Sequence, residues 1–337
     1  MRRATMTAPG VIDISEVTER PVPGPDEVLL RIKRIGVCGS DVHVNHGRHP
    51  FTPYPVVQGH EFSGVIEQVG SDVVDLRPGM KATATPQVTC GRCAPCQRGD
   101  YHICDHLKVQ GFQAPGCAQD FFVTRATRIV PLPDSFTFEQ GAFVEPVAVG
   151  VHAAARLPSV RDRQIVVLGA GPIGNLLSQV LQAEGGKVLI TDVSDHRLEI
   201  ARACGLANVS NATKESLREA AARVFPSGFD LAFDCAGAQE TIAAAVENLQ
   251  KGGTLVLVAV YGEQRVNTGL IQDRELTLTG TLMYRHADFV RAVDLIRSGR
   301  VLTAPLETAH FPLEQFGDAY RFIDDSHDQC MKVFIDV

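Results

Sequence analysis

Apolar positions in the first part of the chain follow the two-residue period of short strands. Val28, Leu30 and Ile32 alternate with Arg31 and Lys33, as in a strand that buries one face. Proline and glycine recur in RPVPGPDE (20–27), FTPYP (51–55) and PLPD (131–134), and such residues are typical of tight turns. The pattern predicts a β-rich region over roughly the first 145 residues.

Beyond Arg161 short runs rich in apolar residues alternate with helical stretches. The runs cover 164–169, 187–191, 229–234, 253–260 and 276–282. The first of them, QIVVLG, is continuously apolar, as is typical of a strand that is buried on both faces. Helical stretches lie at 172–183, 195–204, 239–249 and 288–298. Strands that alternate with helices predict parallel βαβ units.

Length, charge and the N-terminus narrow the class of protein. The chain has 337 residues, enough for two domains. Its net charge of −7 argues against a nucleic-acid-binding surface, which needs a basic face. No stretch approaches the roughly 20 apolar residues of a membrane span, and residues 1–14 lack the apolar segment of a signal peptide. We therefore expect a cytoplasmic protein with reduced cysteines and without nucleic-acid or membrane partners.

Four clustered cysteines predict a structural zinc site. Cys90, Cys93, Cys96 and Cys104 lie in the run CGRCAPCQRGDYHIC. Three of them fall within seven residues, which is too dense for separate disulfides. Four thiolates with two-residue gaps suit the closed tetrahedral coordination of Zn²⁺. The remaining cysteines apart from Cys38 are interpreted as small buried residues.

A glycine-rich turn predicts a dinucleotide site. The sequence Gly169-Ala170-Gly171-Pro172-Ile173-Gly174 follows an apolar strand and opens a helix. This context lets the glycines form the tight turn while the helix N-terminus faces a pyrophosphate. Asp192 ends the next strand, where a carboxylate accepts hydrogen bonds from ribose hydroxyls and repels a 2′-phosphate. We therefore predict NAD rather than NADP, with Arg197 as a further candidate contact near the ribose.

A second group of residues has the composition of a catalytic zinc site. Catalytic zinc takes about three protein ligands and keeps one open position. Cys38 and His60 are the obvious pair, and either Glu61 or Glu145 completes the set. Ser40 follows Cys38 by two residues, so its hydroxyl is placed to accept a hydrogen bond from a bound alcohol.

These motifs together resemble the zinc-dependent medium-chain alcohol dehydrogenases. The segments that carry the resemblance are GVCGSDVH (36–43), GHEFSGVIEQVG (59–70), the four-cysteine loop, EPVAVGVHA (145–153) and VVLGAGPIG (166–174). Glu145 makes the chain similar to the sorbitol or polyol dehydrogenase branch. The resemblance implies an α/β protein with a GroES-like catalytic domain over 1–147 and 285–337. A doubly wound Rossmann domain over 148–284 is inserted between those segments.

The same resemblance implies a reaction and its residues. Hydride passes from a secondary alcohol of a polyol, sugar or sugar acid to NAD, with one catalytic and one structural zinc ion per chain. Cys38, His60 and Glu61 form the metal-binding set, and Glu145 holds the metal directly or through water. A proton relay leads from Ser40 through the nicotinamide ribose to His43. In several relatives the four-cysteine loop lies near subunit contacts, so the resemblance also implies a homodimer or homotetramer.

Two other functions fit the same residues. Threonine 3-dehydrogenases share much of this pattern, so an amino-acid substrate is an alternative. A catalytically silent nucleotide-binding relative is the other, although the intact set of Cys38, His60, Glu61 and Ser40 argues against it. For an acidic substrate, Arg48 and Arg285 are candidates to pair with a carboxylate.

Overall fold

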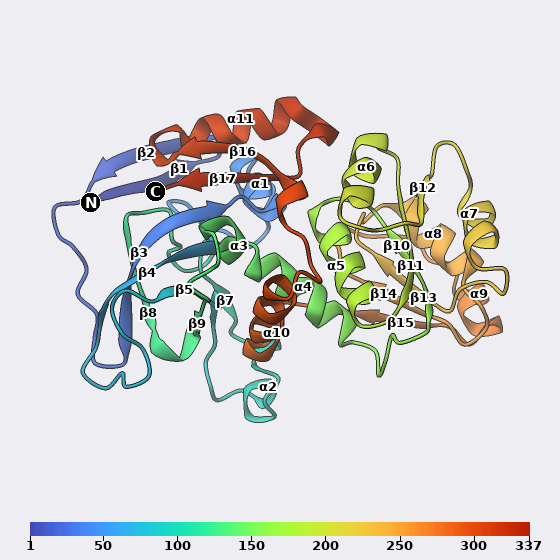
Figure 1. Cartoon of the computed structure of the whole chain (residues 1–337), viewed down its shortest axis with the longest axis horizontal. Coiled ribbons are helices and arrows are strands. Elements are labelled where there is room, and N and C mark those ends of the chain that lie inside the picture. The colour runs from blue at the N-terminus through green and yellow to red at the C-terminus, as the bar shows by residue number, and fades with distance from the viewer. The chain divides into compact units, whose positions relative to one another are not determined.

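The computed structural model describes residues 1–337, which fall into two compact units (Figure 1). The first unit comprises Met1–Glu145, Arg285–Arg297 and Glu307–Val337. The second comprises Pro146–Tyr284 and Ser298–Leu306. The sequence-based boundaries put 298–306 in the first domain. It groups with the second unit because the side-chain amide of Gln179 forms hydrogen bonds with both the backbone N–H and the carbonyl of Leu302.

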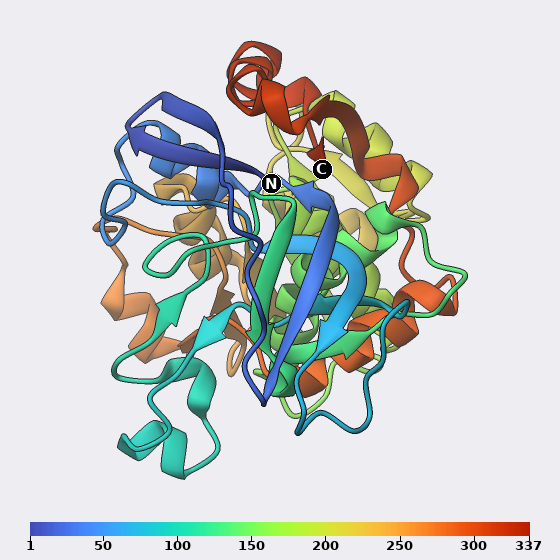
Figure 2. The same cartoon turned by 90° about the vertical axis from the view of Figure 1, so that its left-hand side faces the viewer.

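A seven-stranded sheet forms the frame of the first unit. Its order is β16 (Glu307–Pro312), β17 (Lys332–Asp336), β3 (Glu27–Gly36), β4 (Glu61–Val69), β5 (Lys81–Ala84) and β9 (Ile129–Pro131), with β8 (Phe121–Arg125) also paired to β3. Figure 2 shows the long blue strand β3 running beside β4 and β8. The expected alternation holds only from Leu30 to Ile32, where Arg31 is exposed between two buried residues, because Leu29 is buried as well.

Smaller elements complete the first unit. The strand pairs are β1 (Arg2–Ala8) with β2 (Val11–Glu16), and β6 (Gln87–Val88) with β7 (Lys108–Val109). The helices are α1 (Gly39–Asn45), α2 (Ala94–Gln97), α3 (Phe138–Ala142), α10 (His286–Arg297) and α11 (Phe316–Ser326). Short 3₁₀ turns occupy η1 (Tyr101–Ile103), η2 (Ala126–Arg128), η4 (Leu313–Gln315) and η5 (His327–Gln329). Helix α4 (Val144–Ala154) begins in this unit and continues in the second.

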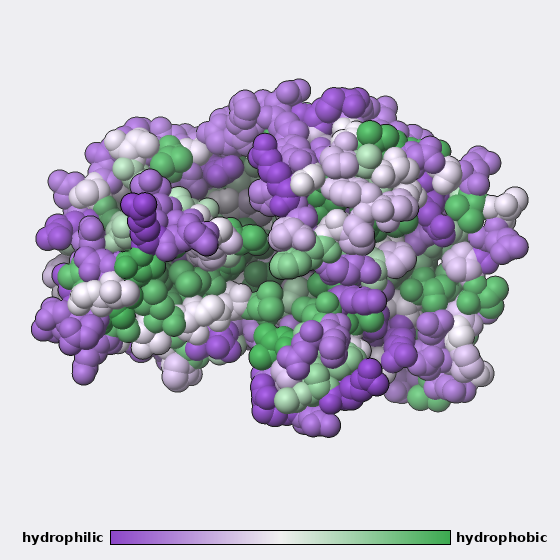
Figure 3. All heavy atoms as spheres, turned by 180° about the vertical axis from the view of Figure 1, so that it is seen from behind, coloured by the Kyte–Doolittle hydropathy of each residue, from purple (hydrophilic) through white to green (hydrophobic).

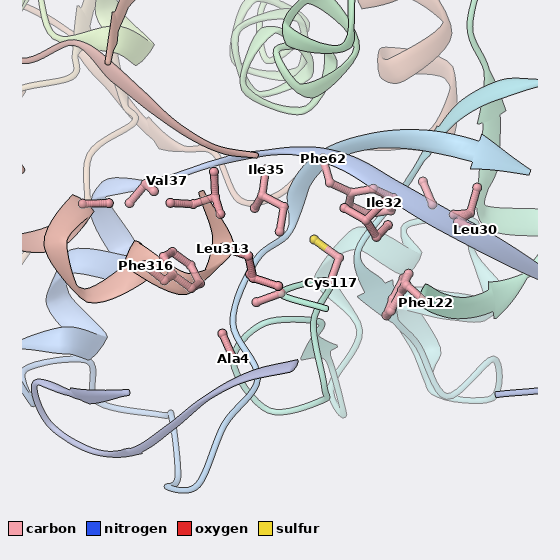
Figure 4. Packing of buried hydrophobic residues seen from close by; sticks show 14 of the residues in the cluster. Ala4, Leu30, Ile32, Ile35, Val37, Phe62, Cys117, Phe122, Leu313 and Phe316 are labelled. Atoms are coloured by element: carbon pink, nitrogen blue, oxygen red, sulfur yellow. The ribbon is translucent and has the colours of Figure 1, made fainter. Parts of the chain in front are cut away.

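One apolar core holds the sheet of the first unit. Ile32, Ile35 and Phe62 of β3 and β4 face the side chains of Cys117 and Phe122 (Figure 4). Segments from both ends of the chain add to this cluster, among them Ala4, Leu313 and Phe316. The core therefore fixes the ends of β3 and β4, and the site described below is built on those strand ends.

The second unit is a parallel sheet with helices. The strand order is β12 (Val209–Asn211), β11 (Lys187–Asp192), β10 (Gln164–Leu168), β13 (Leu231–Asp234), β14 (Thr254–Leu257) and β15 (Thr277–Gly280), all parallel. The helices are α5 (Pro172–Ala183), α6 (Asp195–Ala203), α7 (Leu217–Val224), α8 (Gln239–Asn248) and α9 (Thr268–Asp273), with the 3₁₀ turn η3 (Ala304–Leu306). In chain order the strands read 3-2-1-4-5-6, the doubly wound dinucleotide-binding arrangement. The predicted α/β fold class is confirmed.

Figure 3 shows one face of the molecule, on which hydrophilic residues lie mainly along the margins and hydrophobic residues gather in groups across the middle. No helix combines the length and the apolar character that crossing a bilayer requires.

Candidate active site and metal centres

Three predicted zinc ligands meet at the ends of two paired strands. Strand β3 ends two residues before Cys38, β4 begins at Glu61, and Gly36 pairs with Glu61 in the ladder. The ligand atoms of Cys38, His60 and Glu61 all lie within 4.8 Å of one another. A thiolate, an imidazole and a carboxylate are donors that Zn²⁺ accepts, and three of them leave one tetrahedral position open. The donor set therefore fits a catalytic zinc ion.

Two glycines make this approach of side chains possible. A Cβ atom at Gly36 would collide with the Oε2 atom of Glu61. Gly59, directly before His60, has a φ of +90°, and a Cβ atom there would lie 2.9 Å from the sulfur of Cys117. Any other residue at these positions would displace Glu61 or strain the turn that presents His60.

A buried polar chain faces the imidazole of His60. The Nδ1 atom of His60 lies 3.6 Å from Oδ1 of Asp41, which leaves Nε2 as the nitrogen available to a metal ion. Asp41 also accepts a 3.0 Å hydrogen bond from the backbone N–H of Cys38. The amide of Gln58 donates to the backbone carbonyl of Asp41 at 3.3 Å and accepts a 2.7 Å bond from the Tyr320 hydroxyl. Helix α11 thereby supports the orientation of the site.

Burial and mutual charge shift the pKa values of these groups. Burial, together with the Glu61 charge, raises the pKa of the Cys38 thiol. Burial also raises the pKa of Asp41. For His60 burial acts to lower the pKa, but Asp41 and Cys38 outweigh it and the pKa lies well above its usual value. In this cluster burial disfavours the charged form of each group, and for His60 the neighbouring negative groups act against that effect.

An aromatic wall lies beside His60, and the motifs did not predict it. The ring of Phe112 lies 4.9 Å from the imidazole of His60, between centroids, and the ring of His49 stacks on Phe112 at 4.8 Å. Phe51 contacts His49 edge-on. Aromatic walls with a few polar groups are common in small-molecule sites. The signal in the sequence is weak, because single aromatic residues in loops have no distinctive spacing.

Glu61 has a partner that no motif indicated. The ammonium of Lys332 donates to both carboxylate oxygens of Glu61, at 2.7 and 3.0 Å. Glu145, the alternative ligand, is buried on α4 but is not among the three residues whose ligand atoms converge. Its charge acts on His60 and Lys332 to raise their pKa values, so it is a close electrostatic neighbour of the cluster.

The proposed relay residues occupy the same short helix. Ser40 is half-buried in the first turn of α1, and His43 is exposed in its last turn. Of the two candidate carboxylate-binding arginines, Arg285 pairs with Asp100 at 2.5 Å, so its charge is already neutralised within the first unit. Arg48 is exposed.

The four-cysteine loop has the geometry of a zinc–thiolate tetrahedron. The ligand atoms of Cys90, Cys93, Cys96 and Cys104 lie within 4.8 Å of one another. The sulfur of Cys104 lies 3.6 Å from that of Cys90 and 3.7 Å from that of Cys93. A disulfide requires about 2.05 Å, whereas zinc–sulfur bonds of about 2.3 Å give a tetrahedral edge of about 3.8 Å. The residues present fit a structural zinc ion.

Backbone donors surround the sulfurs of this loop. The N–H groups of Cys90 and His106 both point at the sulfur of Cys104, each at 3.3 Å. Hydrogen bonds from the backbone N–H groups of Arg92 and Cys93 lower the pKa of Cys90 to about 6. Such donors favour the thiolate form, which is the form that ligates metals.

The glycine turn lies where β10 leads into α5. Gly169 has a φ of +97°, and a Cβ atom there would lie 3.0 Å from the backbone nitrogen of Ala236. Gly171 precedes α5, with Pro172 and Ile173 in its first turn. A Cβ atom at Gly174 would collide with the carbonyl of Gly169, so the third glycine permits close packing of helix and strand.

Asp192 at the end of β11 is tied to that turn. Its Oδ2 atom accepts a 2.6 Å hydrogen bond from the N–H of Ala170, and its Oδ1 atom accepts from Ser194 at 2.9 Å. Arg197 lies 3.9 Å from the same carboxylate, and its Nε atom has no hydrogen-bond partner. A buried carboxylate and a nearby arginine therefore stand beside the phosphate-binding turn.

Comparisons with known proteins identify the family. Residues 24–134 match the alcohol dehydrogenase GroES-like domain, and residues 172–298 match the zinc-binding dehydrogenase family. The chain therefore belongs to the zinc-binding dehydrogenases, and it is an oxidoreductase of that family. The resemblance drawn from the motifs is confirmed.

Individual relatives extend this result over nearly the whole chain. Sorbitol dehydrogenase of Bacillus subtilis (strain 168) is 32% identical over 94% of this chain and 92% of its own length. 2-Dehydro-3-deoxy-L-galactonate 5-dehydrogenase of Pseudoalteromonas atlantica is 31% identical over 93% and 92%. A crystal structure of a zinc-binding dehydrogenase from Sinorhizobium meliloti 1021, bound to NADP, superposes with a TM-score of 0.92 at 27% identity, covering 100% and 99% of the two chains.

Proposed function

We propose that this chain oxidises a secondary alcohol of a polyol, sugar or sugar acid with NAD⁺, using a zinc ion held by Cys38, His60 and Glu61. The observation that carries the proposal is the convergence of these three ligand atoms within 4.8 Å. The sorbitol and galactonate-type relatives support the substrate class. When bound, the zinc ion supplies Lewis-acid polarisation of the substrate oxygen. The third ligand is assigned to Glu61, with Glu145 as a charged neighbour.

The residues of the chain perform the positioning and the proton transfer. Asp41 orients the imidazole of His60, so that its other nitrogen faces the metal position. The hydroxyl of Ser40 accepts a hydrogen bond from the substrate alcohol, and it passes its own proton on toward His43 as it takes that of the alcohol. His43 exchanges that proton with solvent, because it is exposed on the next turn of α1 and histidine titrates near neutral pH.

Removal of the Ser40 hydroxyl tests this proton path. Ser40→Ala is expected to lower kcat by about 100-fold, because general acid–base steps contribute roughly 10²- to 10⁴-fold. Zinc content should stay unchanged, since the serine is not a ligand. Ser40→Thr keeps the hydroxyl and serves as the control, with most of the activity retained. Turnover of Ser40→Ala within a few-fold of the wild type would show that the proton leaves by another route.

Asp192 supports the choice of NAD⁺. A buried carboxylate beside the phosphate turn repels a 2′-phosphate and suits ribose hydroxyls. Because the related structure from Sinorhizobium meliloti binds NADP, cofactor preference needs its own test. Asp192→Asn keeps the shape and removes the charge, so kcat/KM for NADP⁺ should rise about tenfold while that for NAD⁺ falls. The guanidinium of Arg197, whose Nη1 atom lies 3.9 Å from Asp192, is then released to pair with the phosphate. A wild-type preference for NADP⁺ would contradict the assignment.

The substrate class is tested by NAD⁺ reduction across a panel of polyols, aldonates and L-threonine, with and without a chelator. The proposal predicts activity with polyols or aldonates that the chelator abolishes and zinc restores. Chelator-sensitive activity confined to L-threonine would assign the chain to amino-acid oxidation. No activity, in a protein that holds zinc in the four-cysteine loop alone, would make it a silent relative.

Two further properties complete the proposal. We expect a homodimer or homotetramer, and light scattering on purified protein measures the oligomeric state directly. We expect a reducing compartment such as the cytoplasm, because the thiols of the four-cysteine loop must stay reduced to hold metal.

A further inference from the structure

A buried lysine from the end of the chain reaches the candidate zinc site. Lys332 opens β17, and its side chain is 4% exposed, against 1% for that of Glu61. Its ammonium donates to Oε2 and Oε1 of Glu61 at 2.7 and 3.0 Å and to the carbonyl of Val37 at 3.1 Å. All three ammonium protons therefore have acceptors. A lysine is rarely buried to this extent unless its charge is paired.

The groups that accept hydrogen bonds from Lys332 belong to residues adjacent in the chain to two of the proposed zinc ligands, Cys38 and His60. Val37 directly precedes Cys38 in the chain, and Glu61 directly follows His60. The carboxylate of Glu61 cannot retreat toward β3 without rearrangement, because it already fills the space that a Cβ atom at Gly36 would need. It is thus held between the lysine on one side and the converging donors on the other.

We propose that Lys332 is a positioning residue that keeps Glu61 a weak, exchangeable ligand of the catalytic zinc ion; this inference rests on the proposed function. A carboxylate that is hydrogen-bonded by an ammonium shares its negative charge between two cations, so its attraction to the metal falls. A metal position with one weak ligand readily admits a substrate oxygen. The ammonium also adds positive charge beside the site, which favours negative charge on that oxygen.

A purely structural role for Lys332 makes the opposite prediction. If Lys332 only joined β17 to β3 and β4, its removal would loosen the donor set and the metal would leave faster. If it restrains Glu61, its removal frees an uncompensated buried carboxylate, which then binds the metal fully. The rate of zinc loss therefore changes in opposite directions under the two roles.

The test is the rate at which zinc passes from the holoenzyme to a colorimetric chelator. Each of the two zinc ions should be released in its own kinetic phase. The phase that belongs to the catalytic ion is identified as the one that is missing in Cys38→Ser. For Lys332→Met we expect at least tenfold slower release in this phase and about tenfold lower kcat. Lys332→Arg keeps the charge and should restore both values. Faster release from Lys332→Met, with normal release from Lys332→Arg, would overturn the inference.

The same substitution of Lys332 is also tested in a Glu61→Gln variant of the protein. In Glu61→Gln the carboxylate charge is absent, so adding Lys332→Met should leave the release rate within about twofold of that of Glu61→Gln alone. A tenfold change in that background would mean that Lys332 acts on the metal by another route. If Lys332→Met does not fold, Lys332→Gln takes its place in both backgrounds, with the same expected directions. A wild-type protein without the Cys38-dependent phase would instead refute the proposed function itself.

Discussion

Cys38→Ser is expected to remove the catalytic zinc ion and at least 10³-fold of kcat/KM, because a bound metal ion contributes several kcal/mol of stabilisation to developing charge. A serine hydroxyl stays protonated at neutral pH and is a poor ligand compared with a thiolate. His60 and Glu61 alone leave too few donors for tight binding. Metal analysis should therefore give one zinc ion per chain in the variant and two in the wild type, one for each converging group.

The control for this variant is another buried cysteine. Cys204→Ser makes the same chemical change at a residue that is 4% exposed and lies in the second unit. It should keep both zinc ions and near wild-type activity, apart from a modest loss of stability. If Cys38→Ser retained two zinc ions and its turnover, the catalytic metal would lie elsewhere in the chain.

Cys93→Ser is expected to cost mainly stability. The four-cysteine loop between β6 and β7 contains only the one-turn helix α2 and the short turn η1, so metal bonds supply most of its order. Loss of one thiolate should remove the structural zinc ion, lower Tm by about 10 °C or more and expose residues 89–107 to proteolysis. The catalytic donor set does not include this loop, so initial turnover at low temperature should fall much less than in Cys38→Ser.

The effect of Cys93→Ser should extend to α10. Asp100 pairs with Arg285 at 2.5 Å, and the Tyr101 hydroxyl accepts a 2.7 Å hydrogen bond from the backbone N–H of His286. Hydrogen exchange should therefore rise in the loop and at the start of α10. Arg92→Ala is the matched control, because it removes an exposed side chain in the same loop and keeps the backbone donor to Cys90. Equal destabilisation in both variants would argue against a metal-held loop.

Local signals in the sequence predict much of this fold. The helix at 172–183 matches α5, and the runs rich in apolar residues mark five of the six strands of the parallel sheet. These elements are predictable because the spacing of their apolar residues can be seen within one short segment of the sequence. Helix α11 is missing from the sequence-based prediction although its buried residues Phe316, Ala319 and Tyr320 recur with helical spacing, whereas the three-residue strand β12 is too short to show a period. The placement of 298–306 in the second unit depends on hydrogen bonds to Gln179, which no local pattern encodes.

The metal sites, too, are only partly predictable from local sequence patterns. Spacing alone predicts the four-cysteine loop, because all ligands fall within one short segment. It also predicts Cys38 and His60, but the choice between Glu61 and Glu145 depends on which carboxylate the strand ends bring to the other donors. Lys332 lies 271 residues from Glu61 in the chain, and only the pairing of β17 with β3 joins them. A lysine in a C-terminal strand carries no signal of that contact.

The most direct test of the account is an anomalous difference map recorded at the zinc absorption edge from crystals of the zinc-loaded protein. The account predicts two peaks per chain. One peak lies inside the four-cysteine loop, and the other lies at about 2.3 Å from the sulfur of Cys38 and about 2.0 Å from a nitrogen of His60. A single peak in the loop, or a second peak away from Cys38 and His60, would contradict the central claim.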